Sequence, residues 1–75
     1  MRVTIVPEDQ YIAVDYIGYN INTEYDQTVH AIQWYDTHGT IEYKAKAAET
    51  FTDISKIQPY INAFMEQRRI NNRQS

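Results

Sequence analysis

A chain of 75 residues with a net charge of −3 makes one small domain. It has no cysteine and only two histidines, which excludes disulfides, thiolate metal sites and a histidine-only zinc cluster, so we expect no metal and no cofactor. A domain of this size buries only about 60% of the surface that its unfolded chain exposes, so its core is thin and depends on packing or on a partner subunit.

The first two segments alternate apolar and polar residues with the period of a β-strand. Residues 2–6 end at Pro7, which cannot donate to a strand ladder. Residues 11–17 end at Gly18, which we expect to interrupt the strand as a bulge or bend. The pattern predicts a hairpin. The side chains expected on its inner face are those of Val3, Ile5, Ile12, Val14 and Tyr16.

Residues 19–28 are rich in asparagine, aspartate and threonine, whose side chains bond to their own backbone and favour turns. We therefore expect a loop here, held to the core by Ile21 and by Tyr25.

The segments 29–35 and 40–44 predict a second hairpin, with Ile32, Trp34, Ile41 and Tyr43 facing inward. The residues between them read as a type I turn with Asp36 in first position. Gly39 is expected to supply the left-handed residue that lets the strands pair again. His38 would stand exposed at the tip of this turn.

The last part of the chain predicts a helix at residues 57–71, after a connection at residues 45–52 that Phe51 anchors. Pro59 suits the first turn, where its missing N–H does no harm. The polar tail at residues 72–75 is expected to fray. The apolar stripe of the helix consists of Ile57, Ile61, Phe64 and Met65, with Tyr60 at one edge.

These segments together predict an α+β fold: an antiparallel sheet of three to four strands with one C-terminal helix packed on one face. Residues 1–75 form a single domain, with the sheet at about 2–44, the helix at about 57–71 and the polar tail at 72–75. The predicted core consists of Val3, Ile5, Ile12, Val14, Ile32, Trp34, Ile41, Tyr43, Phe51, Ile57, Ile61 and Phe64.

Catalytic motifs are missing, and we expect the protein not to be an enzyme. Two glycines cannot build a phosphate loop, and the two serines form no nucleophile elbow. His30 lies in a strand and reads as a structural histidine. Asp36 and Glu42 could approach each other across the hairpin. That end of the hairpin is expected to be exposed to solvent, so the pKa values of the two carboxyl groups would not be shifted for acid–base catalysis. We therefore expect no small-molecule substrate.

The charges are unevenly distributed along the chain. Residues 8–42 hold seven acids and no lysine or arginine, whereas six bases follow from Lys44 onward. Either both faces are simply solvated, or the molecule is dipolar and packs head to tail or against a charged partner. The arginines near the C-terminus are too few to predict nucleic-acid binding beside an acidic remainder. No apolar run is long enough for a targeting segment or a membrane span.

Seven tyrosines are a surplus for so short a chain. They either cover a thin core or line a contact surface, because tyrosine combines a rigid apolar ring with a polar tip. If Ile32 and Trp34 face the helix, the opposite face of the sheet is apolar and aromatic, interrupted only by Asp15. We expect a partner or a second copy to cover that face, with Tyr11 and Tyr35 as anchors. Its other members would be Ala13, Ala31 and Gln33. Arg68 and Arg69, on the other side, would tune association through charge.

The central segment resembles a motif of small uncharacterised proteins encoded by tailed bacteriophages. In those proteins a "H-A-x-Q-W" strand is followed by a "G-x-I/V-E-Y" strand and a final helix. The residues that carry the resemblance here are His30, Ala31, Gln33, Trp34, Gly39, Glu42 and Tyr43. The similarity spans most of the chain. Where the phage pattern has glycine after its first aspartate, this chain has Tyr16, so its second turn is expected to differ.

The resemblance implies a viral origin and no catalytic residues. It suggests an accessory protein that binds other phage proteins or itself, either virion- or tail-associated or an assembly factor. The alternative is a host-directed inhibitor of a bacterial defence complex. Either protein would act in the host cytoplasm during infection, and the first could also be present in the virion.

Overall fold

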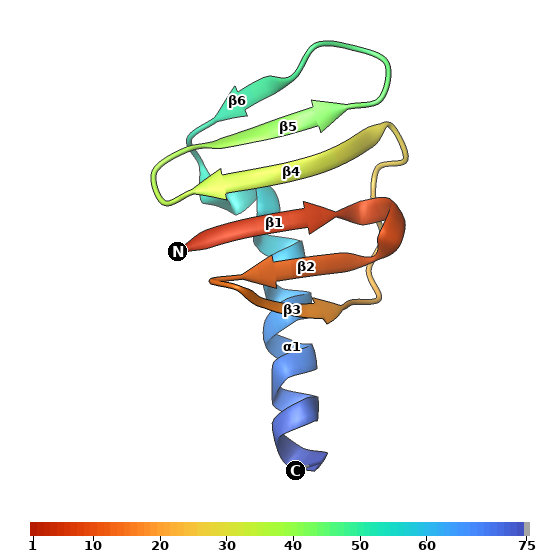
Figure 1. The fold of residues 1–75 in the computed structure, drawn as a ribbon, viewed down its shortest axis with the longest axis vertical. Helices are drawn as coiled ribbons and strands as arrows, with labels where there is room; N and C mark the ends of the chain where they lie inside the picture. The colour runs from red at the N-terminus through yellow and green to blue at the C-terminus, as the bar shows by residue number, and fades with distance from the viewer. Residues whose placement is uncertain (75) are drawn as a thin grey trace.

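The computed structural model describes residues 1–74, which form an α+β fold with one C-terminal helix packed on an antiparallel sheet (Figure 1). The sheet has six strands and not the three to four expected from the sequence. The strands are β1 (Arg2–Val6), β2 (Tyr11–Val14), β3 (Ile17–Asn20), β4 (Val29–Tyr35), β5 (Gly39–Tyr43) and β6 (Glu49–Phe51).

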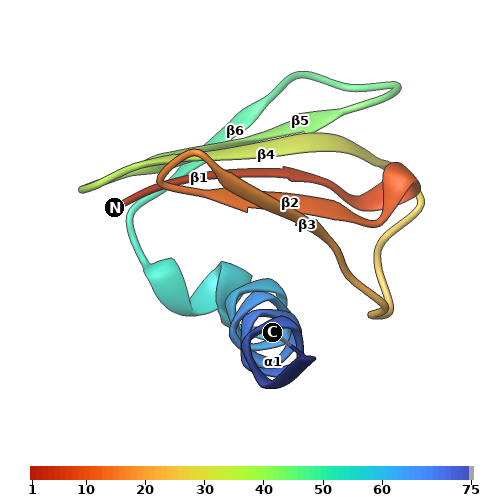
Figure 2. The same ribbon diagram turned by 60° about the horizontal axis from the view of Figure 1, so that its bottom comes forward.

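Two three-stranded meanders lie side by side in this sheet. The strand order is β3-β2-β1-β4-β5-β6, and every neighbouring pair is antiparallel. The join is made by β1 and β4, where Val3 pairs with Trp34 and Ile5 with Ile32. A loop of residues 21–28 connects the meanders on the helix side of the sheet (Figure 2). The first and second hairpins predicted from the sequence are therefore both present, paired through their first strands.

The helix α1 (Gln58–Gln74) crosses beneath the sheet, and its C-terminal half continues past the edge strand β3 (Figure 1). It follows the 3-10 helix η2 (Ile54–Ile57), whose first turn is capped by the Asp53 carboxylate accepting the Ser55 N–H at 2.9 Å. The helix begins within a residue of its predicted start. Residues 72–74, expected to form a polar tail outside the helix, continue α1, and residue 75 lies outside the described chain.

The core fills the space between the inner face of the sheet and α1. Ten of the twelve predicted core residues are buried, whereas Ile41 and Tyr43 are only partly buried because they lie toward the β6 side of the sheet, away from α1. Ile21 is buried, as expected, in spite of its position in a loop. Tyr25, expected to hold the same loop to the core, is only half-buried and is not among the residues packed against the core. The buried residues absent from the predicted core are Pro7, Ile21, Val29, Ala31 and Gly39.

The strand β3 corrects the predicted loop at residues 19–28. The chain reverses at Asp15 and Tyr16, whose φ angles are 48° and 73°, and Val14 then pairs with Ile17. Two positive φ angles in a two-residue connection are those of a type I′ turn, whose twist matches that of the flanking strands. Tyr16, expected on the inner face, therefore lies in the turn and is 95% exposed, and Gly18 lies within a regular strand.

The strand β6 replaces the predicted connection at residues 45–52, and it changes the role of Gly39. No glycine has a positive φ, and the left-handed residue of the β4–β5 turn is Asp36, with φ 69°. A Cβ on Gly39 would stand 2.4 Å from the Phe51 ring and 2.6 Å from the backbone oxygen of Gln33. Gly39 is needed because Phe51 on β6 packs across it, not because of its backbone conformation.

Candidate partner-binding surface

The face of the sheet opposite α1, here called the outer face, has no helix of the described chain on it (Figure 2). The strand register aligns one residue from each strand in a row across its middle. All of these side chains are small or uncharged. The row consists of Gly18, Ala13, Thr4, Gln33, Thr40 and Thr50.

Tyr11 and Tyr35 lie on opposite sides of this middle row, as the register of their strands requires. Tyr11 pairs with Val6 on β1, and Tyr35 pairs with Arg2 at the other end of the same strand. Their exposed fractions are 37% and 38%. The sequence analysis therefore placed Tyr11, Ala13, Gln33 and Tyr35 correctly on one face, because side chains alternate with a period of two along every strand. Ala31, which was expected to be exposed on the same face, is buried and only 7% exposed, next to an irregularity in β4.

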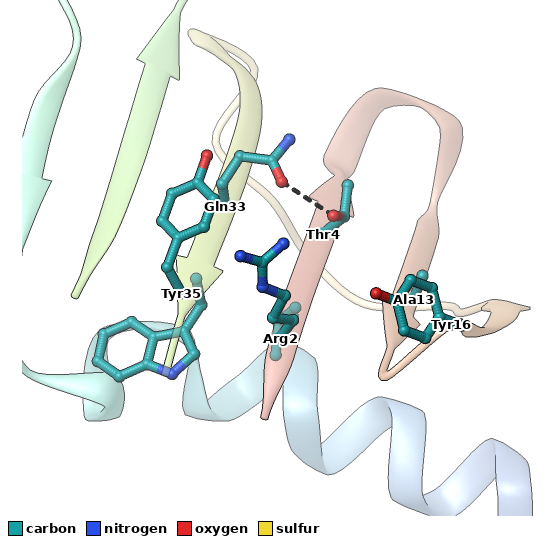
Figure 3. A pocket seen from close by; sticks show the side chains of 8 residues that line it. Arg2, Thr4, Ala13, Tyr16, Gln33 and Tyr35 are labelled. Carbon is teal, nitrogen blue, oxygen red and sulfur yellow. Dashed lines mark hydrogen bonds between the residues drawn. The ribbon is translucent and has the colours of Figure 1, made fainter. Parts of the chain in front are cut away.

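A hollow of about 150 Å³ opens on the outer face at the end where Arg2 and Tyr35 pair (Figure 3). Tyr35 stands on one side and Tyr16 on the other, and the Arg2 guanidinium lies between them. The guanidinium carbon is 5.7 Å from the centre of the Tyr35 ring, within the range of a cation–π contact. The remaining side chains that line the hollow are those of Val3, Thr4, Ala13, Gln33 and Trp34.

The polar side chains of the hollow offer mostly hydrogen-bond donors. The Thr4 hydroxyl donates to the Gln33 side-chain oxygen at 2.9 Å, which leaves the two N–H groups of that amide without an acceptor in the described chain. The Arg2 guanidinium has no ion pair there either. A guanidinium carries donors only. The hollow can therefore hydrogen-bond a group that brings acceptors.

The charges around the hollow cancel. The N-terminal ammonium of Met1 pairs with the Asp36 carboxylate, and the Asp15 carboxylate accepts the Arg2 backbone N–H at 2.9 Å. The hydrogen bond from the N-terminus, helped by the charges of the N-terminus and of Arg2, lowers the pKa of Asp36. Two positive and two negative groups thus stand at this end of the sheet.

The turn that holds Tyr16 is strained. A residue with a side chain at φ 73° is uncommon, and a bulky residue there is an outlier whose backbone costs about 1 kcal/mol or more. Glycine is the ordinary residue at the second position of a type I′ turn. Such strain clusters at functional positions. The sequence analysis placed Tyr16 on the inner face and did not single out Arg2. The Asp15–Tyr16 pair between two alternating segments was the signal for a turn at Tyr16, whereas no sequence signal pointed to Arg2.

Arg68 and Arg69 are not part of the outer face, as expected. Both lie on the half of α1 beyond the sheet. The Arg69 Nε donates to the Glu66 carboxylate at 3.1 Å, and this bond raises the pKa of Arg69 above its ordinary value. Arg68 is exposed. The two arginines therefore lie on α1, on the other side of the sheet from the outer face.

Several acids of the turns and loops have local structural partners, which accounts for part of the uneven charge distribution. The Asp26 carboxylate accepts both the backbone N–H and the hydroxyl of Thr28, and these bonds lower its pKa. The Glu8 carboxylate, between β1 and β2, forms an ion pair at 3.2 Å with the ammonium group of Lys44, which directly follows β5. Asp15 and Asp36 bond the first two residues of the chain. Each of these carboxylates thus has a hydrogen-bond or ion-pair partner within the described chain.

No arrangement of the described residues suggests a catalytic centre or a metal site. His30 is exposed at an irregularity in β4, and His38 is exposed beside Tyr35, with ring centres 5.4 Å apart. Asp36 and Glu42 lie toward opposite ends of the β4–β5 hairpin. Within residues 1–74, no group of three metal-ligating side chains could hold an ion, and no helix is long and apolar enough to cross a membrane.

Comparisons with protein-family models, with curated proteins and with solved structures found no match to this chain.

Proposed function

We propose that the protein is a non-enzymatic bacteriophage accessory protein that works by binding another protein through the outer face of its sheet. The phage origin rests on the resemblance of the central hairpin to small tailed-phage proteins. The mode of action rests on the outer face. A role in the virion, in the tail or in assembly follows from the two together, with activity in the host cytoplasm during infection.

The observation that carries this proposal is an uncovered sheet face with exposed tyrosines at its margins. Apart from Gln33, the middle row consists of small side chains, so a partner can approach the sheet closely. Tyr16 and Tyr35 flank the hollow at one end, and Tyr11 lies on the other side of the row. Binding energy at interfaces concentrates in a few large aromatic residues. We therefore assign Tyr16 and Tyr35 as the anchors.

The test is the change Tyr35→Ser in tagged protein isolated from infected cells. Tyr35 is exposed, so the variant should fold normally and lose its co-purifying phage partner. Met65→Ser is the control, because Met65 is 60% exposed and lies on α1, across the sheet from the outer face. Retention of the partner by the Tyr35 variant would refute the role of the outer face.

Mass spectrometry of purified particles tests the place of the protein in the phage. A virion or tail component is present at a fixed ratio to the other particle proteins. An assembly factor is absent from particles but is retained by unfinished tails or heads. Capture of a host defence protein in place of a phage protein would overturn the proposal in favour of a host-directed inhibitor.

A further inference from the structure

Both lateral edges of the sheet are open. The edge strands are β3 and β6, and each pairs on one side only within the described chain. An edge strand presents backbone N–H and C=O groups that another strand can bond, and charged residues or proline usually protect it. The β3 segment, Ile17–Asn20, contains neither a charged residue nor a proline. The β3 edge is therefore open to pairing with a further strand.

The register shows which backbone groups of β3 point outward. The Ile21 N–H donates to the Gln10 carbonyl at 2.7 Å, at the end of the β2–β3 pairing. In an antiparallel pair every second residue bonds to the neighbouring strand, and the residues between turn their N–H and C=O the other way. Asn20 and Gly18 therefore direct their backbone groups away from β2. Two donors and two acceptors stand free on this edge.

The same alternation identifies the outward group of β6. The Tyr35 N–H donates to the His38 carbonyl at 2.7 Å, so Gly39 turns its backbone groups away from β4 and toward β6. Gly39 pairs with Phe51, which leaves the N–H and C=O of the next residue inward, Thr50, pointing away from β5. Thr50 is thus the counterpart of Gly18: the two residues end the middle row of the outer face.

The two edges also match in direction. Six strands that alternate in direction leave β3 and β6 antiparallel to each other. A second copy in the same orientation therefore presents its β6 as an antiparallel neighbour of β3. Pairing of Gly18 with Thr50 of the second copy keeps both residues on the outer face, because directly opposed residues of paired strands share a face. The middle row then continues from one copy into the next.

The helix is offset toward β3 in a way that a second copy completes. Phe64 packs on Tyr19 of β3, with ring centres 5.3 Å apart, and residues 65–74, here called the overhang, continue past that edge (Figure 1). Ten helical residues extend about 15 Å, the width of about three strands. At the opposite end α1 does not reach β5 and β6, and the inward side chains of Ile41 and Tyr43 are left half-buried.

We propose that the chain assembles head to tail with a second copy of itself, β3 of one copy pairing with β6 of the next. The overhang of the first copy then lies beneath β6 and β5 of the second, where it covers Ile41 and Tyr43. The 17 residues of α1 extend about 25 Å, close to the repeat of about 29 Å for six strands, so the helices follow one another beneath a continuous sheet. Such a contact is heterologous, so it propagates as an array or closes into a ring.

The charges at the two ends of the domain favour this contact. Arg68 lies on the overhang and Asp53 follows β6, and both are exposed. Neither has an ion pair within the described chain. Head-to-tail assembly brings the positive end of one copy toward the negative end of the next. Association should therefore weaken as the salt concentration rises.

The overhang opposes the other simple arrangement, in which β3 pairs with β3 of a second copy. A twofold axis through that junction would bring both overhangs into the same space, because α1 passes beneath β3 (Figure 2). Head-to-tail pairing also leaves the outer face uncovered. The inference is therefore independent of the proposed function, and Tyr35→Ser should associate as the parent does.

Two proline variants test the inference, because each removes one outward N–H. Asn20→Pro blocks the β3 edge and Thr50→Pro blocks the β6 edge, and proline is tolerated at edge positions whose N–H faces away from the sheet. In sedimentation velocity, the mass of the parent should rise with concentration, and each proline variant should remain a monomer. Asn20→Ala and Thr50→Ala keep the N–H, so these matched controls should associate like the parent.

An equimolar mixture of the two proline variants gives the sharpest result. Asn20→Pro retains its β6 edge and Thr50→Pro retains its β3 edge, so the mixture should form a one-to-one dimer and nothing larger. Association of Thr50→Pro by itself would show β3–β3 pairing and overturn the head-to-tail arrangement. Association of both variants separately would move the contact to another surface. A parent chain that stays monomeric at about 1 mM would overturn self-assembly altogether.

Cysteine cross-linking gives the same answer if a proline variant fails the check of its fold by circular dichroism. The chain has no cysteine, so Asn20→Cys and Thr50→Cys each place a single thiol at one edge of the outer face. A short bifunctional maleimide should join the two variants when they are mixed and should join neither to itself. Cross-linking of Asn20→Cys to itself, or none in the mixture, would contradict the head-to-tail contact.

Discussion

Tyr11 lies across Gly18 on the neighbouring strand, so closely that a Cβ on Gly18 would stand 2.1 Å from the Tyr11 hydroxyl oxygen. The two residues are diagonal neighbours on the outer face, because Tyr11 pairs with Asn20 and Ala13 with Gly18. The aromatic ring shields a glycine backbone that would otherwise lie bare in an edge strand. Substitution of Tyr11 would therefore change stability as well as binding. Substitutions of Tyr16 and Tyr35 are the more direct tests of partner binding.

Gly18→Ala should lower the free energy of unfolding by about 1 kcal/mol, because the new methyl group displaces the Tyr11 ring. In a Tyr11→Ser background the same change should be neutral or stabilising, since alanine is better than glycine within a strand by about 0.5–1 kcal/mol. Urea denaturation of the four proteins in this cycle measures the coupling. Additive effects would show that the two side-chain positions do not interact.

Gly39→Ala should be the more damaging glycine substitution. The Cβ would meet the Phe51 ring at 2.4 Å and the Gln33 backbone oxygen at 2.6 Å, and a backbone atom in a central strand cannot move aside as a side chain can. Overpacking of this kind costs about 1–3 kcal/mol. A melting temperature at or above that of the parent would contradict the close contact between β5 and β6.

Trp34→Ala should cost about 3–5 kcal/mol, because a large buried side chain leaves a cavity. Trp34 is 5% exposed, and its ring centre lies 5.4 Å from that of Phe51. Trp34→Phe, which keeps an aromatic ring in this position, is the milder comparison. Thermal unfolding followed by circular dichroism gives the ranking, and normal melting of the alanine variant would refute the core assignment.

Tyr16→Gly should stabilise the isolated protein by about 1 kcal/mol, because glycine adopts the left-handed backbone of the Asp15–Tyr16 turn without strain. Few large-to-glycine changes stabilise a protein, so the sign is diagnostic. Tyr16→Ala removes the ring without relieving the backbone and serves as the control. A loss of stability in the glycine variant would mean that the turn carries no strain.

The Met1–Asp36 ion pair should stabilise the fold only within a limited range of pH. The pKa of Asp36 is lowered from 3.8, so its contribution is present above that value and is lost as the pH falls through the folded-state pKa. The pKa of the N-terminal ammonium is raised from 8.0, so the pair is also lost as the pH rises through that raised pKa. Melting temperatures of the parent and of Asp36→Asn should therefore differ most between these limits.

The control for this pH dependence is Asp9→Asn, which removes an exposed carboxylate from the turn between β1 and β2. Its melting temperature should parallel that of the parent across the same range. A constant difference between the parent and Asp36→Asn, from acid to alkaline pH, would show that the ion pair does not contribute to stability.

The alternation of apolar residues determined which face each long strand buries. Because side chains alternate with a period of two, Val3 and Ile5 had to share one face of their strand, as did Ile32 and Trp34, and burial of these apolar residues brought both sets to the inner face. The same parity placed Tyr11, Ala13, Gln33 and Tyr35 together on the other face. The apolar spacing of the C-terminal segment also predicted its buried side, since Ile57 at the end of η2 and Ile61 and Phe64 in α1 are all buried. Met65, which was expected in the same stripe, is 60% exposed.

Only the tertiary structure decided the two edge strands and the hollow. A short segment such as Ile17–Asn20 has weak strand propensity of its own and becomes a strand because β2 offers a pairing edge and Tyr11 covers Gly18. Phe51 likewise belongs to β6 because Gly39 leaves room for its ring. Arg2, Tyr16 and Tyr35 lie far apart in the sequence. They line one hollow because β1 pairs with both β2 and β4, and strand pairing over such separations depends on the packing of the whole core.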